Sequence, residues 1–173
     1  SIVRFDRDPY SWRSKSSQLL RKKQMMWGSN LFHIGILIVL MGHVVGLLTP
    51  IAIFDVIGIS HGFKQVLAMT VGGIAGGFCL IGLLMLIHRR LFDPRIRATS
   101  SFADIAVLFL LLAQLLLGLF TITVSMKHLD GHEMVKFMEW AQHIVTFRGS
   151  AAEFLRDVHL AFKLHLTLGM LIF

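Results

Sequence analysis

Three histidines lie within long apolar stretches of the sequence: His33, His43 and His165. An ionisable side chain at membrane depth is costly and rare unless it faces a bundle interior, so each is a candidate functional residue. A neutral imidazole can bind a haem iron, accept a proton or form a hydrogen bond to a neighbouring helix. From the residues alone, both the haem-ligand role and the hydrogen-bonded packing role stay open.

The elements that position these histidines are predicted to be membrane-spanning helices. Hydrophobic residues make up 55% of the chain and charged residues 16%, and the mean hydropathy is +0.70. Nearly uncharged segments of about 20 residues recur, which is the length that crosses roughly 30 Å of hydrocarbon. We expect one all-α membrane domain over residues 1–173, a polytopic helical bundle truncated at both ends, because Ser1 is not an initiator methionine and the last apolar segment stops at Phe173. The predicted spans are 29–48, 65–88, 102–124 and 158–173.

Depth along the helices predicts which histidines meet. His43 lies about 8 Å inside the outer end of its helix, and His165 lies about 10 Å inside the outer start of an antiparallel one. Two imidazoles at one depth can occupy both axial positions of one haem iron, and Gly42 and Gly46 leave room beside His43 for the macrocycle. His33 is about 15 Å nearer the cytoplasm, so it would serve a second haem whose other ligand lies beyond Phe173.

Lysine and arginine are concentrated in two segments that flank the predicted spans. Short cytoplasmic loops carry the excess of positive charge, so both segments are predicted to face the cytoplasm and the chain to be a multi-pass protein of the inner, cytoplasmic membrane. This topology accounts for the net charge of +7 without nucleic acid, because the basic residues do not alternate with stacking aromatics. The first segment holds Arg4, Arg7, Arg13, Lys15, Arg21, Lys22 and Lys23, and the second holds Arg89, Arg90, Arg95 and Arg97.

Other reactive or small residues have simpler interpretations. The lone Cys79 is predicted to be a buried structural thiol. The glycine pairs at 72–73 and 76–77 are predicted to allow close approach of another helix, with a flat cofactor as the alternative. His88 lies at a predicted helix edge beside Arg89. The remaining histidines are predicted to be polar surface residues in or near outer loops, where some could instead help quinol binding or proton release: His61, His128, His132, His143 and His159.

Several motifs together resemble the gamma, cytochrome b subunit of respiratory nitrate reductase. The resemblance runs through nearly the whole chain in the right order, and the motifs are specific only in combination. They are Ser29-Asn30-Leu31-Phe32-His33-Ile34-Gly35, His43 with Gly46 and Leu48-Thr49-Pro50, Arg89-Arg90-Leu91-Phe92-Asp93-Pro94-Arg95 with Arg97-Ala98-Thr99, Trp140-Ala141-Gln142 with Ile144-Val145-Thr146-Phe147, and Leu164-His165-Leu166 with Leu168-Gly169-Met170.

This resemblance implies a membrane subunit with five spanning helices and two b haems. The outer haem would have ligands matching His43 and His165, and the inner haem one matching His33. Lys64 looks like the lysine associated with quinol binding, although residues 51–62 depart from the family pattern and an interfacial, snorkelling lysine is the alternative. The implied partners are quinol, membrane lipid, an iron-sulfur beta subunit and a molybdenum-containing alpha subunit, where nitrate would be reduced. The basic cytoplasmic segments would be their docking sites.

Two other functions remain open at this stage. One is a related cytochrome b subunit that serves another reductase, such as a sulfite- or heterodisulfide-reductase-associated complex. The other is a haem-free transporter or structural membrane subunit, although the sequence has no inverted repeat and no pair of broken helices.

Overall fold

The structure is a computed structural model that describes residues 20–127 and 129–172. Every regular element in those two ranges is a helix, which confirms the predicted all-α fold. Some residues singled out in the sequence lie outside the described residues, namely Arg4, Arg7, Arg13, Lys15, His128 and Phe173.

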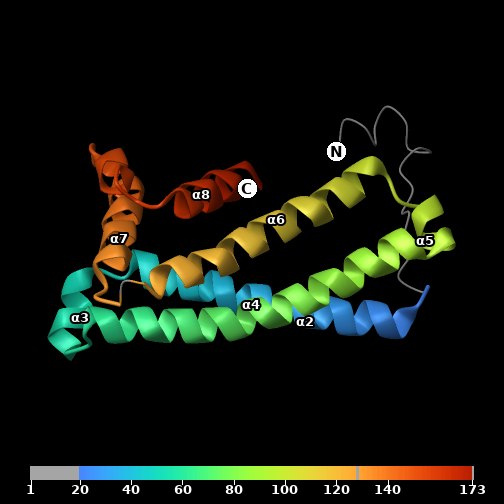
Figure 1. Cartoon of the computed structure of the whole chain (residues 1–173), viewed down its shortest axis with the longest axis horizontal. Helices are drawn as coiled ribbons and strands as arrows, with labels where there is room; N and C mark the ends of the chain where they lie inside the picture. The colour runs from blue at the N-terminus through green and yellow to red at the C-terminus, as the bar shows by residue number, and fades with distance from the viewer. Residues whose placement is uncertain (1–19, 128, 173) are drawn as a thin grey trace, which may run out of the picture.

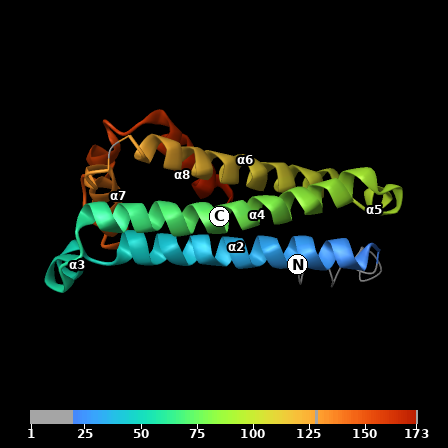
Figure 2. The same ribbon diagram turned by 60° about the horizontal axis from the view of Figure 1, so that its bottom comes forward.

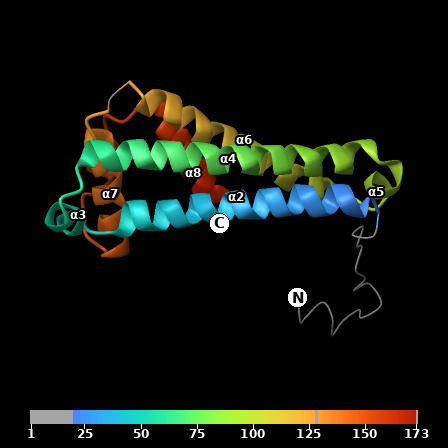
Figure 3. The ribbon, with the colours of Figure 1, turned by 90° about the horizontal axis from the view of Figure 1, so that it is seen from below.

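Two long antiparallel helices form the main body of the fold. α2 (Lys22–Leu48) and α4 (His61–Phe92) lie side by side, as Figures 1 and 3 show. They contain 27 and 32 residues, and at about 1.5 Å per residue each is longer than the roughly 30 Å of hydrocarbon. Both therefore extend beyond the predicted spans 29–48 and 65–88, because hydropathy marks only the apolar part of a helix and misses its polar ends.

Small residues bring α2 and α4 together. A Cβ built on Gly35 would lie 2.6 Å from both the Ala75 carbonyl oxygen and the Cys79 nitrogen, and one on Gly82 would overlap the Phe32 nitrogen. Only glycine permits this backbone approach, which resembles the small-residue interfaces of membrane helices. Cys79 is buried here, in agreement with its predicted structural role.

The predicted glycine pairs of α4 contribute to a different contact. A Cβ on Gly76 would lie 2.8 Å from Leu119 Cδ2 on α6 (Phe102–Ser125), and one on Gly73 would lie 3.6 Å from Ile122 Cδ1. A Cβ on Gly72 or Gly77 would have no neighbour within 4 Å among the described residues. The packing prediction is therefore confirmed for one glycine of each pair, and the tighter α2–α4 contact uses glycines that the sequence analysis did not select.

The helix α6 starts at the residue that hydropathy predicts. Its beginning is fixed by a capping box, in which Ser101 Oγ accepts from the Asp104 nitrogen (3.3 Å) and Asp104 Oδ2 accepts from the Ser101 nitrogen (2.8 Å). Its mean hydropathy reaches 2.7, yet none of its described residues is buried. Such an apolar surface would be unfavourable in water, so it fits a helix surrounded by lipid.

The last helix, α8 (Leu160–Ile172), packs against α6 (Figure 2). It begins two residues after the predicted Val158, and its 13 residues cover about 20 Å, less than the thickness of the hydrocarbon core. Of the four predicted spans, three appear as spanning-length helices within the described residues, and the fourth is this shorter apolar helix.

Short helices cover the two ends of the bundle. The end that is predicted to face the cytoplasm is called the inner end, and the opposite end the outer end. At the inner end lies α5 (Pro94–Ala98), whose N-cap Asp93 accepts from the Arg95 and Ile96 nitrogens and pairs with Arg21 Nε at 2.9 Å. The outer end carries α3 (Ile51–Ile57), α7 (His132–Val145) and the 3-10 helix η2 (Ala151–Leu155), of which α3 and α7 stand across the ends of α2 and α4 in Figure 1. These connections fix how the long helices are aligned.

Candidate haem site

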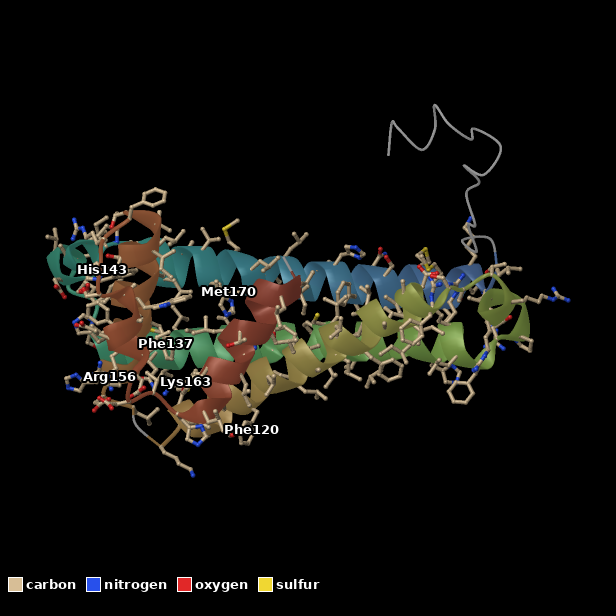
Figure 4. The ribbon with its side chains drawn as sticks, turned by 90° about the horizontal axis from the view of Figure 1, so that it is seen from above. Phe120, Phe137, His143, Arg156, Lys163 and Met170 are labelled. Atoms are coloured by element: carbon tan, nitrogen blue, oxygen red, sulfur yellow. The ribbon has the colours of Figure 1, made fainter. Side chains whose placement is uncertain are left out.

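The structure brings His43 and His165 together, as the depth comparison predicted. Their ring centroids lie 6.3 Å apart, and the ring planes are inclined by 42°. His43 is five residues before the end of α2, and His165 is in the first half of α8. In Figure 4, α8 runs from Lys163 to Met170 in the direction of α2, and the ring separation shows that the His165 side chain reaches His43 of α2.

In both rings, Nδ1 lies within hydrogen-bonding distance of a backbone carbonyl oxygen. His43 Nδ1 lies 2.7 Å from the Val39 oxygen, and His165 Nδ1 lies 3.1 Å from the Gln114 oxygen. A carbonyl only accepts, so each Nδ1 carries the proton and donates it. The other nitrogen, Nε2, then holds the lone pair that a metal requires, which is the usual arrangement for a ligating histidine.

The spacing of the two rings fits one metal ion between them. A metal–imidazole bond of about 2.0 Å, plus about 1.1 Å from nitrogen to ring centre on each side, separates two axial rings by roughly 6.2 Å. The observed separation of 6.3 Å agrees with that value. The pair supplies two imidazoles, which is the number of protein ligands that a b haem with both axial positions filled requires. The described residues contain no group of three or more potential metal ligands.

The histidine pair has open space beside its α2 glycines and a close contact with α6. A Cβ on Gly42 or Gly46 would meet no atom of the described residues within 4 Å, consistent with the predicted room beside His43. A Cβ on Gly118 would instead lie 2.9 Å from His165 Cε1. The sequence analysis missed Gly118, whose signal is a lone glycine in the apolar run of α6.

His33 also presents Nδ1 to a backbone carbonyl oxygen, but no second histidine ring lies beside it in the described structure. Its Nδ1 lies 2.7 Å from the Ser29 oxygen and 3.2 Å from Ser29 Oγ, so its Nε2 is also available. Its described ring neighbour is Phe32, at 5.4 Å. Residues 20–127 and 129–172 bring no second histidine ring against it, and the predicted partner beyond Phe173 is not part of the described chain.

Lys64 is buried instead of exposed. Its relative exposure is 7%, so neighbouring residues enclose its side chain. Its Nζ lies 2.8 Å from Met138 Sδ on α7 and 3.7 Å from the centroid of the Phe54 ring on α3. No carboxylate pairs with it among the described residues, so a cation sits at the outer end with a cation–π contact and a weak sulfur acceptor as its partners.

Two glutamines that the sequence analysis did not select tie helices together near the site. Gln114 Nε2 donates to the His165 oxygen at 3.0 Å, and Gln142 Nε2 donates to the Leu47 and Thr49 oxygens at 3.2 and 3.1 Å. A polar residue in the middle of the apolar span 102–124 was the available signal for Gln114. The Gln142 contacts satisfy carbonyls at the end of α2, where a helix leaves its last acceptors without partners.

The other described histidines differ in exposure. His132 is exposed, whereas His143 is half-buried and its ring lies 4.8 Å from that of Phe154. His61 Nε2 lies 3.5 Å from Asp55 Oδ1, and His159 Nδ1 accepts from the Ala161 nitrogen at the start of α8. His88 stacks on Phe92 at the inner end. None of these rings contacts His43 or His165 in the described structure.

Comparison with known proteins identifies the family. The family model for the nitrate reductase gamma subunit matches residues 1–173. The respiratory nitrate reductase 1 and 2 gamma chains of Escherichia coli (strain K12) are each 49% identical over 173 residues, covering 100% of this chain and 76% of the relative. The nitrate reductase gamma chain of Bacillus subtilis (strain 168) is 40% identical over 174 residues, covering 99% of this chain and 77% of the relative. The chain, with its paired histidines and apolar helices, belongs to the nitrate reductase gamma subunit family.

Proposed function

We propose that this chain is the membrane haem b subunit that oxidises quinol near the outer face and delivers the electrons, with two b haems as carriers, to a cytoplasmic nitrate reductase. The observation that carries the proposal is the His43–His165 pair, 6.3 Å apart with both Nδ1 atoms bonded to carbonyls. Membership of an oxidoreductase family with membrane helices supports it.

The chain's own residues would hold the haems. His43 and His165 would supply both axial ligands of the outer haem, and Gly42 and Gly46 would leave space for its ring beside α2. His33 would supply one ligand of the inner haem. A b haem held by two histidines has no open iron position, so it transfers electrons and does not bind oxygen or nitrate.

The outer end has a group suited to quinol. Lys64 is a buried ammonium that lacks a carboxylate partner among the described residues, and a quinol oxygen would be a better acceptor than the Met138 sulfur that it now contacts. Protons released by quinol would leave on the outer side, where α3 and α7 meet the aqueous phase. Lys64 would therefore bind and orient quinol.

The inner end has basic residues suited to a partner. Arg95 and Arg97 are exposed, as are Lys22 and Lys23. Three other basic residues of the predicted docking segments serve the fold instead: Arg21 pairs with Asp93, Arg89 donates to the Leu20 oxygen, and Arg90 donates to Ser100 Oγ.

Among the described residues, this division leaves Lys22, Lys23, Arg95 and Arg97 as the proposed docking residues, while Arg4, Arg7, Arg13 and Lys15 of the first segment lie outside the described residues. We propose that an iron-sulfur beta subunit docks there, that a molybdenum-containing alpha subunit carries the nitrate chemistry, and that the complex lies in the inner membrane.

A reduced-minus-oxidised absorption spectrum of the full-length protein in membranes tests the proposal. Wild type is expected to show two b-type components. His43→Leu and His165→Leu should each remove the same one, His33→Leu should remove the other, and the exposed His132→Leu should remove neither. Wild type without b-type absorption would overturn the proposal and favour a haem-free transporter or structural membrane subunit.

A further inference from the structure

The contact between α6 and α8 is built on a reciprocal pair of hydrogen bonds. His165 Nδ1 donates to the Gln114 backbone oxygen at 3.1 Å, and the Gln114 side-chain Nε2 donates back to the His165 backbone oxygen at 3.0 Å. One residue of α6 thus holds both the ring and the main chain of one residue of α8. Two bonds between the same pair of residues fix both the rotation of α8 and its height along α6.

Two glycines make this pair possible. A Cβ on Gly118 would lie 2.9 Å from His165 Cε1, and a Cβ on Gly169 would lie 3.0 Å from Gln114 Nε2. Each glycine lies one helical turn from a member of the pair, Gly118 after Gln114 and Gly169 after His165. Each helix therefore presents a polar side chain to a glycine of the other helix, so the two surfaces fit in one register.

His165 is the one candidate ligand whose ring depends on another helix. His33 and His43 bond to Ser29 and Val39, four residues earlier on their own helix, so α2 orients both rings by itself. α8 offers no such acceptor to His165 Nδ1 in the described structure, where the acceptor is on α6. The direction of the His165 ring is thus set by the α6–α8 register.

We propose that Gln114 is a positioning residue for His165, with Gly118 as the residue that admits the ring. The proposal rests on the proposed haem function, because it assigns to Gln114 the task of aiming Nε2 of His165 at the outer haem iron. Partners that orient a metal-binding histidine commonly contribute about 10–100-fold to retention of the metal centre. The effect should be largest at the outer haem, since the pair holds the His165 ring directly. The inner-haem ligand expected beyond Phe173 would be affected only through the register of α8.

The first test compares Gln114→Leu with Gln24→Leu in the full-length protein within its complex. Gln24 is a matched control, because its Nε2 also donates to a carbonyl on a neighbouring helix, the Met85 oxygen at 3.3 Å, but at the inner end. The readouts are haem content per chain, the low-spin electron paramagnetic resonance signals and a redox titration of each haem. Gln114→Leu keeps the backbone oxygen that accepts from His165 Nδ1 but removes the side-chain bond that fixes the register of α8. It should weaken retention of the outer haem by up to about tenfold and shift its signal and potential more than those of the inner haem, while the Gln24→Leu protein stays like wild type.

A second variant covers the case in which Gln114→Leu does not assemble. Gly118→Ala keeps Gln114 and adds one methyl group against His165, whereas Gly77→Ala adds a methyl group that no described atom approaches within 4 Å. We expect Gly118→Ala alone to perturb the outer haem. Unchanged outer signals in both the Gln114 and Gly118 variants, or equal changes of the two haems, would overturn the positioning role. Wild type without haem would instead overturn the proposed function itself.

Discussion

The three histidines within the apolar helices share one local arrangement. His33, His43 and His165 each present Nδ1 to a backbone carbonyl oxygen, which leaves Nε2 as the acceptor. In a histidine that only packs a bundle, either ring nitrogen could equally donate a hydrogen bond to a neighbouring helix. The use of Nδ1 as the donor in all three rings therefore favours a ligand role for Nε2. The contacts of the ring nitrogens are therefore more informative than the presence of the histidines.

Replacement of Lys64 is expected to impair quinol oxidation. Lys64→Met should lower kcat/KM for quinol oxidation about 10–100-fold, because a hydrogen bond to a charged group contributes roughly 1.5–3 kcal/mol. Haem absorption should stay unchanged, and thermal stability should stay equal or rise, since burying an ammonium without an anionic partner is costly. The measurement is steady-state oxidation of a soluble quinol analogue.

The exposed Lys127 offers a matched control on the outer side. Lys127→Met removes a positive charge in the same region without removing a buried one, so it should leave quinol oxidation near the wild-type rate. If Lys64→Met retains full quinol oxidation with intact haem, Lys64 does not bind quinol.

The helices differ in how their contacts are made. α2 and α4 approach through glycines in their inner halves, around Gly28, Gly35 and Gly82, whereas Gly42 and Gly46 near the outer end of α2 have no close neighbour. α6 and α8 combine Gly118 and Gly169 with a polar pair. Both interfaces therefore use glycines, and the α6–α8 interface adds two hydrogen bonds.

A side chain at Gly35 is expected to destabilise the contact between α2 and α4. Gly35→Ala would place a methyl group 2.6 Å from the Ala75 oxygen, and we expect the helices to separate at a cost of about 1–3 kcal/mol. Gly77→Ala should be neutral or stabilising by up to about 1 kcal/mol, because alanine has the higher helix propensity and meets no described atom. Thermal unfolding of the detergent-purified protein measures both. Equal melting temperatures for the two variants would show that α2 and α4 tolerate the added methyl group.

The sequence predicts the long apolar helices but not the short helices, for physical reasons. Hydropathy locates α2, α4 and α6 because uncharged runs fit only the bilayer, and the fixed helical rise predicts that His43 and His165 lie at one depth. It does not locate α3, α5 or α7, which are too short to give an uncharged run of about 20 residues. Gln114 was missed because its role depends on the rotation of α8, and the burial of Lys64 was missed because it depends on Phe54 and Met138 from two connecting helices.

The whole molecule has two ends with different chemistry. At the inner end, Arg21, Arg89 and Arg90 are used by the fold, while Arg95 and Arg97 point their charge to the surroundings. At the outer end, α7 is tied to α2 through Gln142, and Lys64 is enclosed between α3 and α7. Quinol and reductase would thus meet opposite ends of one electron path.

Charge reversal at the inner end is expected to weaken assembly with the reductase. The double variant Arg95→Glu, Arg97→Glu should weaken assembly with the beta subunit about tenfold or more at low salt, and less at high salt, because exposed charges act through a screened field. Co-purification at two ionic strengths measures this. Arg148→Glu, an exposed reversal on the outer side, should leave assembly intact. Normal assembly of the double variant would remove Arg95 and Arg97 from the docking surface.

The pairing of His43 with His165 also sets an order of events during synthesis. α2 and α4 are joined by a short connection, so these two helices can associate as soon as both have entered the membrane. His165 belongs to α8, the last described helix. The paired-histidine site therefore cannot form until α8 has been made and has docked on α6, so completion of the site follows the synthesis of α2, α4 and α6.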